Sequence, residues 1–517
     1  MGPGNPAQRT SKTAPKTDQT RNWHQLVYYD GGIGTGNLND LDKNRQGATG
    51  AGLEENVIEA YNFVVLNYQP GDEILCFGFS RGAYTARAVA GLIADVGVLK
   101  PLEMQFFYDV YRRYREFGLS VEAKRGKSFR DSGAWAALKE QGVFIDGVEP
   151  PEASRSIKVV GVWDTVGSLG LPDIFGHDNG DWRKQYEFHN VKLSKHVDHA
   201  YHALALDEKR RAFRPTLWYI DPKYNTNSEL KQVWFPGVHI NCGGGNNDAF
   251  PNLDTDMENI SIATFTWMLQ CIAPHVDLDQ KGFNDYLKQY STWLDNLRYR
   301  CTIIHPDILS KVINKIEDKL DATERDTLVR MGAKPHPHPN LYFGWGVGPI
   351  IDSYTLEYKN FNAPAYTRLP GNEEMETDGK WNPITGPPTQ PTGFLTNEYI
   401  HPLVQHRREA LKPALWSQAM NGWERKLSVE KDGSARYWWS KGSLRLPEWC
   451  ILPNTEAEIN YERTWYNAAL EMARDVSKVK TTDAVEAAGG KDFLARLDAE
   501  IKYQPDLKPP RGNTWKL

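Results

Sequence analysis

A serine between two glycines is the first candidate for chemistry in this chain of 517 residues. Residues 78–82 read Gly-Phe-Ser-Arg-Gly and match G-x-S-x-G, the pattern of a nucleophilic serine on a turn between a strand and a helix. The apolar run 72–79 predicts the strand, and the alanine-rich run 81–99 predicts the helix. We expect Ser80 to be a nucleophile, and we expect both glycines to be required because a Cβ at either would collide across the turn. The alternative is a serine that only caps the helix.

A nucleophilic serine needs a base, and the base needs an orienting acid. His239 stands just past the apolar strand pattern "VWFPGVH" and before three glycines, and Asp164 ends the strand pattern "IKVVGVW". The carboxyl ends of parallel strands form the edge at which open α/β sheets bind ligands. The chain order Ser80, Asp164, His239 is the order of the α/β-hydrolases. For His239 the alternative is a histidine buried in the core.

Three other histidines have a spacing that could bind a metal. His196, His199 and His202 follow one another at every third residue and could share one face of a helix. The one nearby carboxylate, Asp198, would point elsewhere, so we favour a packed or solvated helix and predict no metal site. Together with Asp30, which ends an earlier predicted strand, these histidines leave open a metal-dependent phosphoesterase.

A glycine loop follows the first predicted strand, 24–32. We expect the backbone N–H groups of Gly31 or Gly32 and of Arg81 to form an oxyanion hole, which stabilises the negative oxygen formed during acyl transfer. The loop also resembles a dinucleotide-binding turn, but Asn37 stands where that motif needs its last glycine. No phosphate-binding P-loop motif is present, and no cofactor is predicted.

Strand and helix patterns alternate along the first part of the chain, which predicts a mostly parallel sheet covered by helices. We expect a disordered tail at 1–21 and an α/β core at 22–330 with a helical insertion at about 103–153. Residues 331–517 are rich in proline and tryptophan and are expected to form a cap and a C-terminal helical region. The other predicted helices lie at 53–68, 257–272 and within 454–503, and the later strands at 156–170 and 230–245.

The composition is that of a globular protein with no preference for nucleic acid. The net charge is −5, and 40% of the residues are hydrophobic. The five cysteines are widely spaced and include no CxxC pair, which favours a reducing compartment. No secretory signal and no membrane-spanning run is recognisable, so we expect a cytoplasmic protein without stable membrane insertion. The sequence contains no pattern that specifies an oligomeric state.

Five ordered blocks resemble one family of α/β-hydrolases. These are "YYDGGIGTG", "GDEILCFGFSRGAYTARAVAGLI", "VVGVWDTVGSLG", "AYHALALDEKRRAFRPTLW" and "VWFPGVHINCGGG". The family comprises fungal and bacterial hydrolases related to the phospholipase effectors of type VI secretion systems. Later segments, "DSYTLEYKNF", "RLPG" and "TNEYIHPLVQHR", resemble its fungal branch, so that the resemblance covers roughly 24–460.

The resemblance assigns roles to particular residues. It implies that Ser80 is the nucleophile, Asp164 the acid and His239 the base. The family usually has an aspartate two residues after that histidine, where this chain has Asn241, so the pocket or the activity is expected to differ there. His401, in a block of the fungal branch, is a pocket residue or a second choice for the base.

The leading hypothesis is a serine esterase or lipase that forms an acyl-enzyme on Ser80. The bacterial members of the family act on phospholipid acyl esters, which implies a lipid or another hydrophobic ester as substrate. A catalytically silent α/β-hydrolase scaffold that binds a small molecule or a protein is the second hypothesis, and the metal-dependent phosphoesterase is the third.

Overall fold

The computed structural model describes five stretches of the chain: 24–31, 51–166, 192–245, 258–302 and 345–476. Short gaps interrupt these stretches at 125, 211–212, 223–224, 226, 349, 351, 355–364, 372, 376–380, 384–394, 412, 430–434, 453 and 456–458. The predicted tail, 1–21, and the end of the predicted C-terminal helical region lie outside the described residues.

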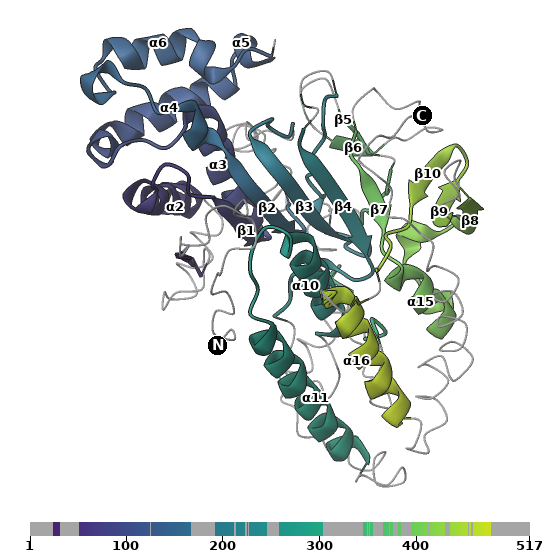
Figure 1. Ribbon diagram of the computed structural model, residues 1–517. Helices are drawn as coiled ribbons and strands as arrows, with labels where there is room; N and C mark the ends of the chain where they lie inside the picture. The colour runs from purple at the N-terminus through teal and green to yellow at the C-terminus, as the bar shows by residue number, and fades with distance from the viewer. Residues whose placement is uncertain are drawn as a thin grey trace, which may run out of the picture.

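A five-stranded parallel sheet forms the centre of the molecule (Figure 1). Its strands run in the spatial order β1-β2-β3-β4-β7. Their bounds are Leu75–Phe79 for β1, Ile157–Trp163 for β2, Val197–Ala205 for β3, Glu229–Phe235 for β4 and Glu398–Ile400 for β7. Parallel pairing brings the carboxyl ends of these strands to one edge of the sheet and their amino ends to the other.

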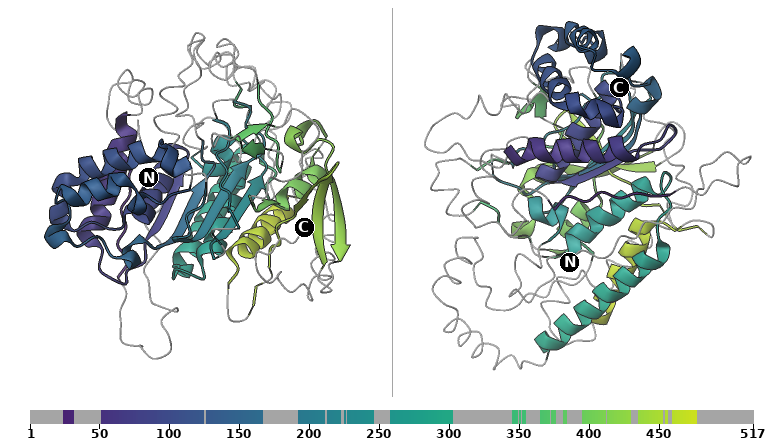
Figure 2. Two further views of the ribbon diagram at one scale, coloured as in Figure 1. Left: turned by 90° about the horizontal axis from the view of Figure 1, so that it is seen from above. Right: turned by 90° about the vertical axis from the view of Figure 1, so that its left-hand side faces the viewer.

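Helices cover both faces of the sheet, as the mostly parallel arrangement requires (Figure 2). Helices α2 and α3 lie on one face, where their side chains pack against Val160 and Val162. Helices α10, α11 and α16 lie on the other, where Val159 and Tyr201 join their core. The bounds are Ala51–Asn67 for α2, Arg81–Val96 for α3, Asn259–Ile272 for α10, Gln280–Thr302 for α11 and Tyr461–Val476 for α16.

Two further groups of elements flank this core. Between α3 and β2 lie the α-helices α4 (Phe107–Gly118), α5 (Val121–Lys124) and α6 (Gly133–Glu140), together with short 3-10 helices, the first of them at Pro101–Phe106. Beyond β7 lie α15 (Leu403–Ala410) and an antiparallel sheet of β8 (Glu424–Val429), β9 (Ala435–Lys441) and β10 (Leu444–Pro447). A small hairpin pairs β5 (Glu373–Met375) with β6 (Trp381–Pro383).

Three expectations about secondary structure are wrong. The strand expected at 230–245 ends at Phe235, and helix α8 (His239–Gly243) follows it. Residues 24–31 form no strand, and Tyr28 instead stacks on Phe63 and hydrogen-bonds Glu59, both on α2. Residues 197–205 form the central strand β3 and not a helix. Its polar side chains find partners on neighbouring elements, which allows a strand with two histidines to be buried.

No single helix in the described stretches has the length and apolar character needed to cross a membrane. One consecutive pair, α3 and the helical segment 101–118, meets these criteria only when the two are taken together, and they are bent by 109° relative to each other.

Candidate active site

Ser80 lies at the carboxyl end of β1, on a strained turn directly before α3. Its φ of 57° and ψ of −120° belong to a region that residues other than glycine rarely adopt, at a cost of about 1–3 kcal/mol. Gly78 makes the turn possible, because a Cβ there would lie 2.1 Å from the carbonyl oxygen of Gly82. The expectation for Gly82 itself was wrong, since a Cβ at that position would meet nothing within 4 Å.

Asp164 follows β2, next to the strand that ends at Ser80. Its side chain is fully buried, its φ is 42°, and its Oδ1 accepts a hydrogen bond from the backbone N–H of Ala205 at 3.0 Å. His202, on β3, supports the same turn: its Nε2 accepts a hydrogen bond from the N–H of Thr165 at 3.1 Å. The other nitrogen, Nδ1, lies 3.1 Å from Oε1 of Gln232 and donates to it. The neutral tautomer of His202 therefore positions the turn that carries Asp164.

His239 connects these two residues. It begins the short helix α8 (His239–Gly243), just after β4. Its Nε2 lies 2.7 Å from Oγ of Ser80, and its Nδ1 lies 2.7 Å from Oδ2 of Asp164. The imidazole packs between the rings of Phe79 and Phe213, with centroid distances of 4.7 and 4.9 Å. The three residues that the sequence selected thus form one continuous chain of hydrogen bonds.

Arg368 completes the surroundings of Asp164, and sequence reasoning gave it no role. Its fully buried guanidinium holds both carboxylate oxygens, with Nη1 2.5 Å from Oδ1 and Nη2 3.0 Å from Oδ2. It also donates to the carbonyl oxygens of Ala205 and Phe213. Burial by itself raises the pKa of Asp164, but the charge of Arg368 and the interaction with His239 outweigh it and hold that pKa well below its usual range. The carboxylate is therefore ionised at any pH near neutrality.

A second buried carboxylate fixes the backbone of His239. Oε2 of Glu208 accepts a hydrogen bond from the N–H of His239 at 3.2 Å. The guanidinium of Arg210 holds Glu208 through Nε and Nη2 and stacks on Phe213. Burial favours the protonated acid, but Arg210 outweighs it and lowers the pKa of Glu208 to about 2. Both carboxylates around His239 are therefore paired with their own arginine.

The family follows from a comparison with known sequences. The profile described as "T6SS, Phospholipase effector Tle1-like, catalytic domain" matches residues 8–271, which is just over half of the chain. The chain belongs to this Tle1-like family. The matched region contains Ser80, Asp164 and His239, whereas Arg368 lies beyond its end.

One curated relative is also similar to the chain. The Saccharomyces cerevisiae protein named "Uncharacterized protein YEL023C" is 26% identical over 205 residues, which are 37% of this chain and 27% of that protein. The chain therefore matches little more than a quarter of the relative's length. No solved structure matches.

The structure describes two of the three residues expected to form the oxyanion hole, Arg81 and Gly31. Arg81 is the first residue of α3, so its N–H belongs to the helix N-terminus beside Ser80. Gly31 is exposed in the segment 24–31, which is not a strand. Gly32 lies outside the described residues. The backbone donor from this loop therefore stays a prediction.

Asn241, at the position where the resemblance implies an aspartate, is fully buried in α8. Its Oδ1 accepts a hydrogen bond from the N–H of Val238 at 3.1 Å, an interaction that an aspartate would make equally well. Its Nδ2 has no hydrogen-bond partner among the described residues. Asn241 thus makes the hydrogen bond that starts α8 and adds a buried donor.

His401, the second choice for the base, is engaged elsewhere. Its Nε2 lies 3.1 Å from Oε1 of Glu462 on α16, and its Nδ1 accepts a hydrogen bond from the N–H of Leu403 at 3.2 Å. Its ring stacks on Phe235 with centroids 4.3 Å apart. The imidazole that reaches Oγ of Ser80 is that of His239, and His401 instead links β7 to α16.

The three histidines considered for a metal face do not share one face. His196 precedes β3, and His199 and His202 are on that strand, three residues apart, so their side chains point to opposite faces of the sheet. Asp30 lies in the exposed segment 24–31. The sequence-based grouping of these residues was wrong because it assumed helical spacing.

This arrangement can activate a hydroxyl group. An imidazole at hydrogen-bonding distance can take the proton of Ser80, and an ionised carboxylate on its other nitrogen stabilises the imidazolium that results. The start of α3 presents backbone N–H groups and the positive end of its dipole beside the serine oxygen.

Proposed function

We propose that this protein is a serine hydrolase of the α/β-hydrolase type that cleaves a carboxylic ester through an acyl-enzyme on Ser80. The observation that carries the proposal is the continuous chain of hydrogen bonds from Oγ of Ser80 through His239 to Asp164. The strained backbone of Ser80 supports it further, since strain of this kind is concentrated at active sites.

In the first half of the reaction, Oγ of Ser80 attacks the carbonyl carbon of the ester while its proton moves to Nε2 of His239. The negative oxygen of the tetrahedral intermediate accepts a hydrogen bond from the N–H of Arg81 and from a second donor, for which Gly31 and Gly32 remain our candidates. The carbon–oxygen bond to the leaving group then breaks, and His239 returns the proton to the departing alcohol. The acyl group stays on Ser80.

In the second half, water replaces the alcohol. His239 takes a proton from the water as it attacks the acyl carbon, and then gives that proton to Oγ of Ser80 as the acid is released. Throughout both halves, Asp164 holds the Nδ1–H tautomer of His239 and stabilises its cationic form. Arg368 positions Asp164.

A lipid or another hydrophobic ester is the substrate class that we favour. The support is the family description, which names a phospholipase effector. The division expected from the sequence, with a core at 22–330 and a cap and C-terminal helical region at 331–517, needs a correction, because β7 pairs with β4 in the central sheet and α16 packs in the core on one of its faces. The contact of Arg368 with Asp164 supports a close association of these two parts.

Hydrolysis of nitrophenyl esters of increasing chain length, and of a phospholipid, tests this function. We expect the wild-type protein to cleave at least one of them and S80A to lose the activity. S120A is the matched control, because Ser120 lies in the bend between α4 and α5, away from Ser80, and its Oγ accepts a hydrogen bond from the local N–H of Ala123. A rate for S80A equal to that of S120A would overturn the mechanism, and folded protein without any activity would favour the silent scaffold.

A further inference from the structure

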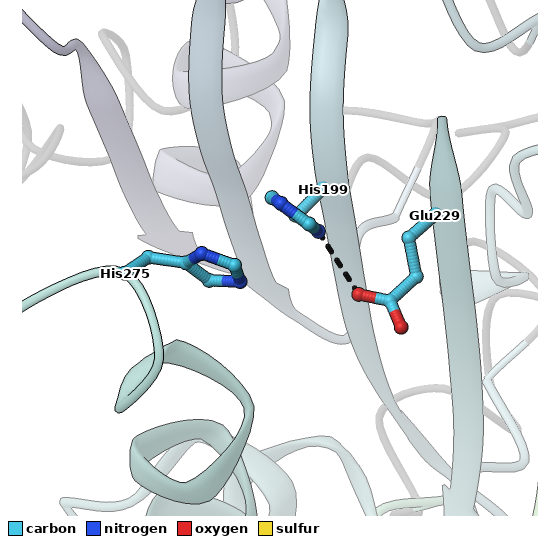
Figure 3. A group of neighbouring side chains, drawn as sticks. All are labelled: His199, Glu229 and His275. Atoms are coloured by element: carbon cyan, nitrogen blue, oxygen red, sulfur yellow. Dashed lines mark hydrogen bonds and ion pairs between the residues drawn. The ribbon is translucent and has the colours of Figure 1, made fainter. Parts of the chain in front are cut away.

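A second cluster of chemically active side chains lies at the opposite edge of the sheet. His199 is close to the start of β3, and Glu229 is the first residue of β4, where it is the direct neighbour of His199 in the parallel register. His275 follows the end of α10, the helix that covers this face. Ser80 and His239, in contrast, follow the carboxyl ends of their strands. Figure 3 shows the three side chains of the cluster turned toward one another.

The ligand atoms of the cluster are close together. One nitrogen from each histidine and one oxygen of Glu229 all lie within 4.8 Å of one another. Nδ1 of His199 is 2.9 Å from Oε2 of Glu229, and the two imidazole rings stack with centroids 3.8 Å apart. Among the described residues, this is the one group of three or more histidine, cysteine and acidic side chains with such spacing.

The groups around the cluster orient its carboxylate. Nζ of Lys231 pairs with Oε1 of Glu229 at 2.7 Å, which leaves Oε2 on the side of the histidines. The hydroxyl of Tyr201 donates to Oε2 at 2.8 Å and lies 3.3 Å from Nε2 of His275. Outer partners of this kind fix the orientation of the ligands in protein metal sites.

We propose that His199, Glu229 and His275 bind a divalent transition-metal ion, for which zinc is the best match. Two imidazoles and one carboxylate are a common ligand set for zinc, and they leave a fourth position for water. The side chains of His199 and Glu229 are 23% and 27% exposed, so the ion can reach them from solvent. Binding of the ion would replace the hydrogen bond between Nδ1 of His199 and Oε2 of Glu229.

The charges around the cluster set the expected affinity. Lys231 and Lys158 oppose a nearby dication, and therefore we expect a micromolar dissociation constant and not the far tighter binding of a buried structural zinc. The ion would tie the end of α10 to the sheet, away from Ser80.

Titration of the purified full-length protein with Zn²⁺, and with Co²⁺ as a spectroscopic probe, tests the site. We expect one ion to bind with the visible spectrum of tetrahedral Co²⁺, and a saturating ion to raise Tm by at least about 2 °C. H275Q should weaken this binding by at least tenfold. E229Q should also weaken the binding of the ion by at least tenfold. Because glutamine has nearly the same shape as glutamate, this variant keeps the test valid even if H275Q folds poorly.

The matched control is H196A, because His196 precedes the same strand and lies outside the cluster. It should bind the ion as the wild-type protein does. Equal affinities for wild type, H275Q and E229Q would overturn the proposal, since the ion would then bind elsewhere. Failure of the wild-type protein to bind Zn²⁺ at 100 micromolar, which is about the upper limit of the expected range, would overturn it too. Both results are independent of ester hydrolysis.

Discussion

The two edges of the central sheet each carry a histidine hydrogen-bonded to a carboxylate, and the two pairs differ in burial and in the group that faces the histidine. Nδ1 of His239 lies 2.7 Å from Asp164, and Nδ1 of His199 lies 2.9 Å from Glu229. Asp164 is fully buried and held by an arginine, whereas Glu229 is partly exposed and faces a second imidazole. Only the first pair has a strained serine on the far side of its histidine.

Burial and the third partner distinguish an acid–base relay from a set of metal ligands. A relay needs a permanently ionised carboxylate, a single imidazole in one tautomer and a hydroxyl fixed at its free nitrogen. A metal site needs several lone pairs that converge on a point open to solvent. The same two residue types supply either function, depending on the third partner and on burial.

The largest expected effect comes from breaking the relay at its acid. D164N removes the charge that stabilises the imidazolium and favours the wrong tautomer, so we expect kcat for ester hydrolysis to fall by about 10⁴-fold. D198N is the matched control, because Asp198 lies at the other edge of the sheet, where it pairs with Lys158 at the surface. In steady-state kinetics, kcat of D198N should lie within about twofold of the wild-type value. Equal losses of kcat in D164N and D198N would contradict a special role of Asp164 in the relay.

Arg368 is expected to have a smaller effect, because it acts through Asp164. R368M should lower kcat by about 10- to 100-fold, the usual cost of losing a partner of a functional ligand. Loss of the positive charge beside Asp164 stabilises the protonated His239–Asp164 pair, so the acidic limb of the pH profile of kcat/KM should move to higher pH.

R368K keeps the positive charge, although it loses the bidentate hydrogen bond to Asp164. It should return the acidic limb of the pH profile of kcat/KM toward its wild-type position. If the pH profile of R368M equals that of the wild type, Arg368 has a purely structural role, even where kcat is lower.

The buried histidines predict an acid-sensitive fold. Burial, as the main cause, lowers the pKa of His202 and of His406 to about 3, while an unfolded histidine titrates near 6.5. Between these values the unfolded state binds more protons, so the free energy of unfolding falls as the pH falls. Each histidine contributes about 1.4 kcal/mol per pH unit in that window and nothing above it.

Denaturant unfolding between pH 7 and pH 4 measures this slope. H202Q should remove the contribution of His202 to the pH dependence of the free energy of unfolding. Glutamine can accept a hydrogen bond from the N–H of Thr165 and donate one to Gln232, but it does not titrate. An identical slope in H202Q would mean that His202 is protonated in the folded protein.

The smallest effect is expected at Gly82. A Cβ there meets nothing within 4 Å, so G82A should keep its stability and hydrolyse esters within about threefold of wild type. G78A is the contrasting variant, because its Cβ would collide with the carbonyl of Gly82, and we expect a loss of several kcal/mol or no folded protein. Thermal melts of both variants check this, and equal melting temperatures would contradict the geometry of the turn.

The sequence predicted the parts of the site that follow recognisable strands. Ser80, Asp164 and His239 each come after an apolar run, and because parallel strands end at one edge, their meeting could be anticipated. The strand β3 was missed because its histidines and Asp198 obscure the apolar pattern of a central strand. Arg368 had no such signal: it stands in the short block "RLPG", far along the chain, and only the folded structure brings it to Asp164.

Covalent labelling with a fluorophosphonate, which reacts with activated serines, tests the acyl-enzyme on Ser80 without a choice of substrate. We predict a single adduct by intact mass, located on Ser80 by peptide mapping, no adduct in S80A, and slow labelling in H239A. An adduct of equal amount in S80A, or active wild-type enzyme that takes no label, would contradict the acyl-enzyme mechanism.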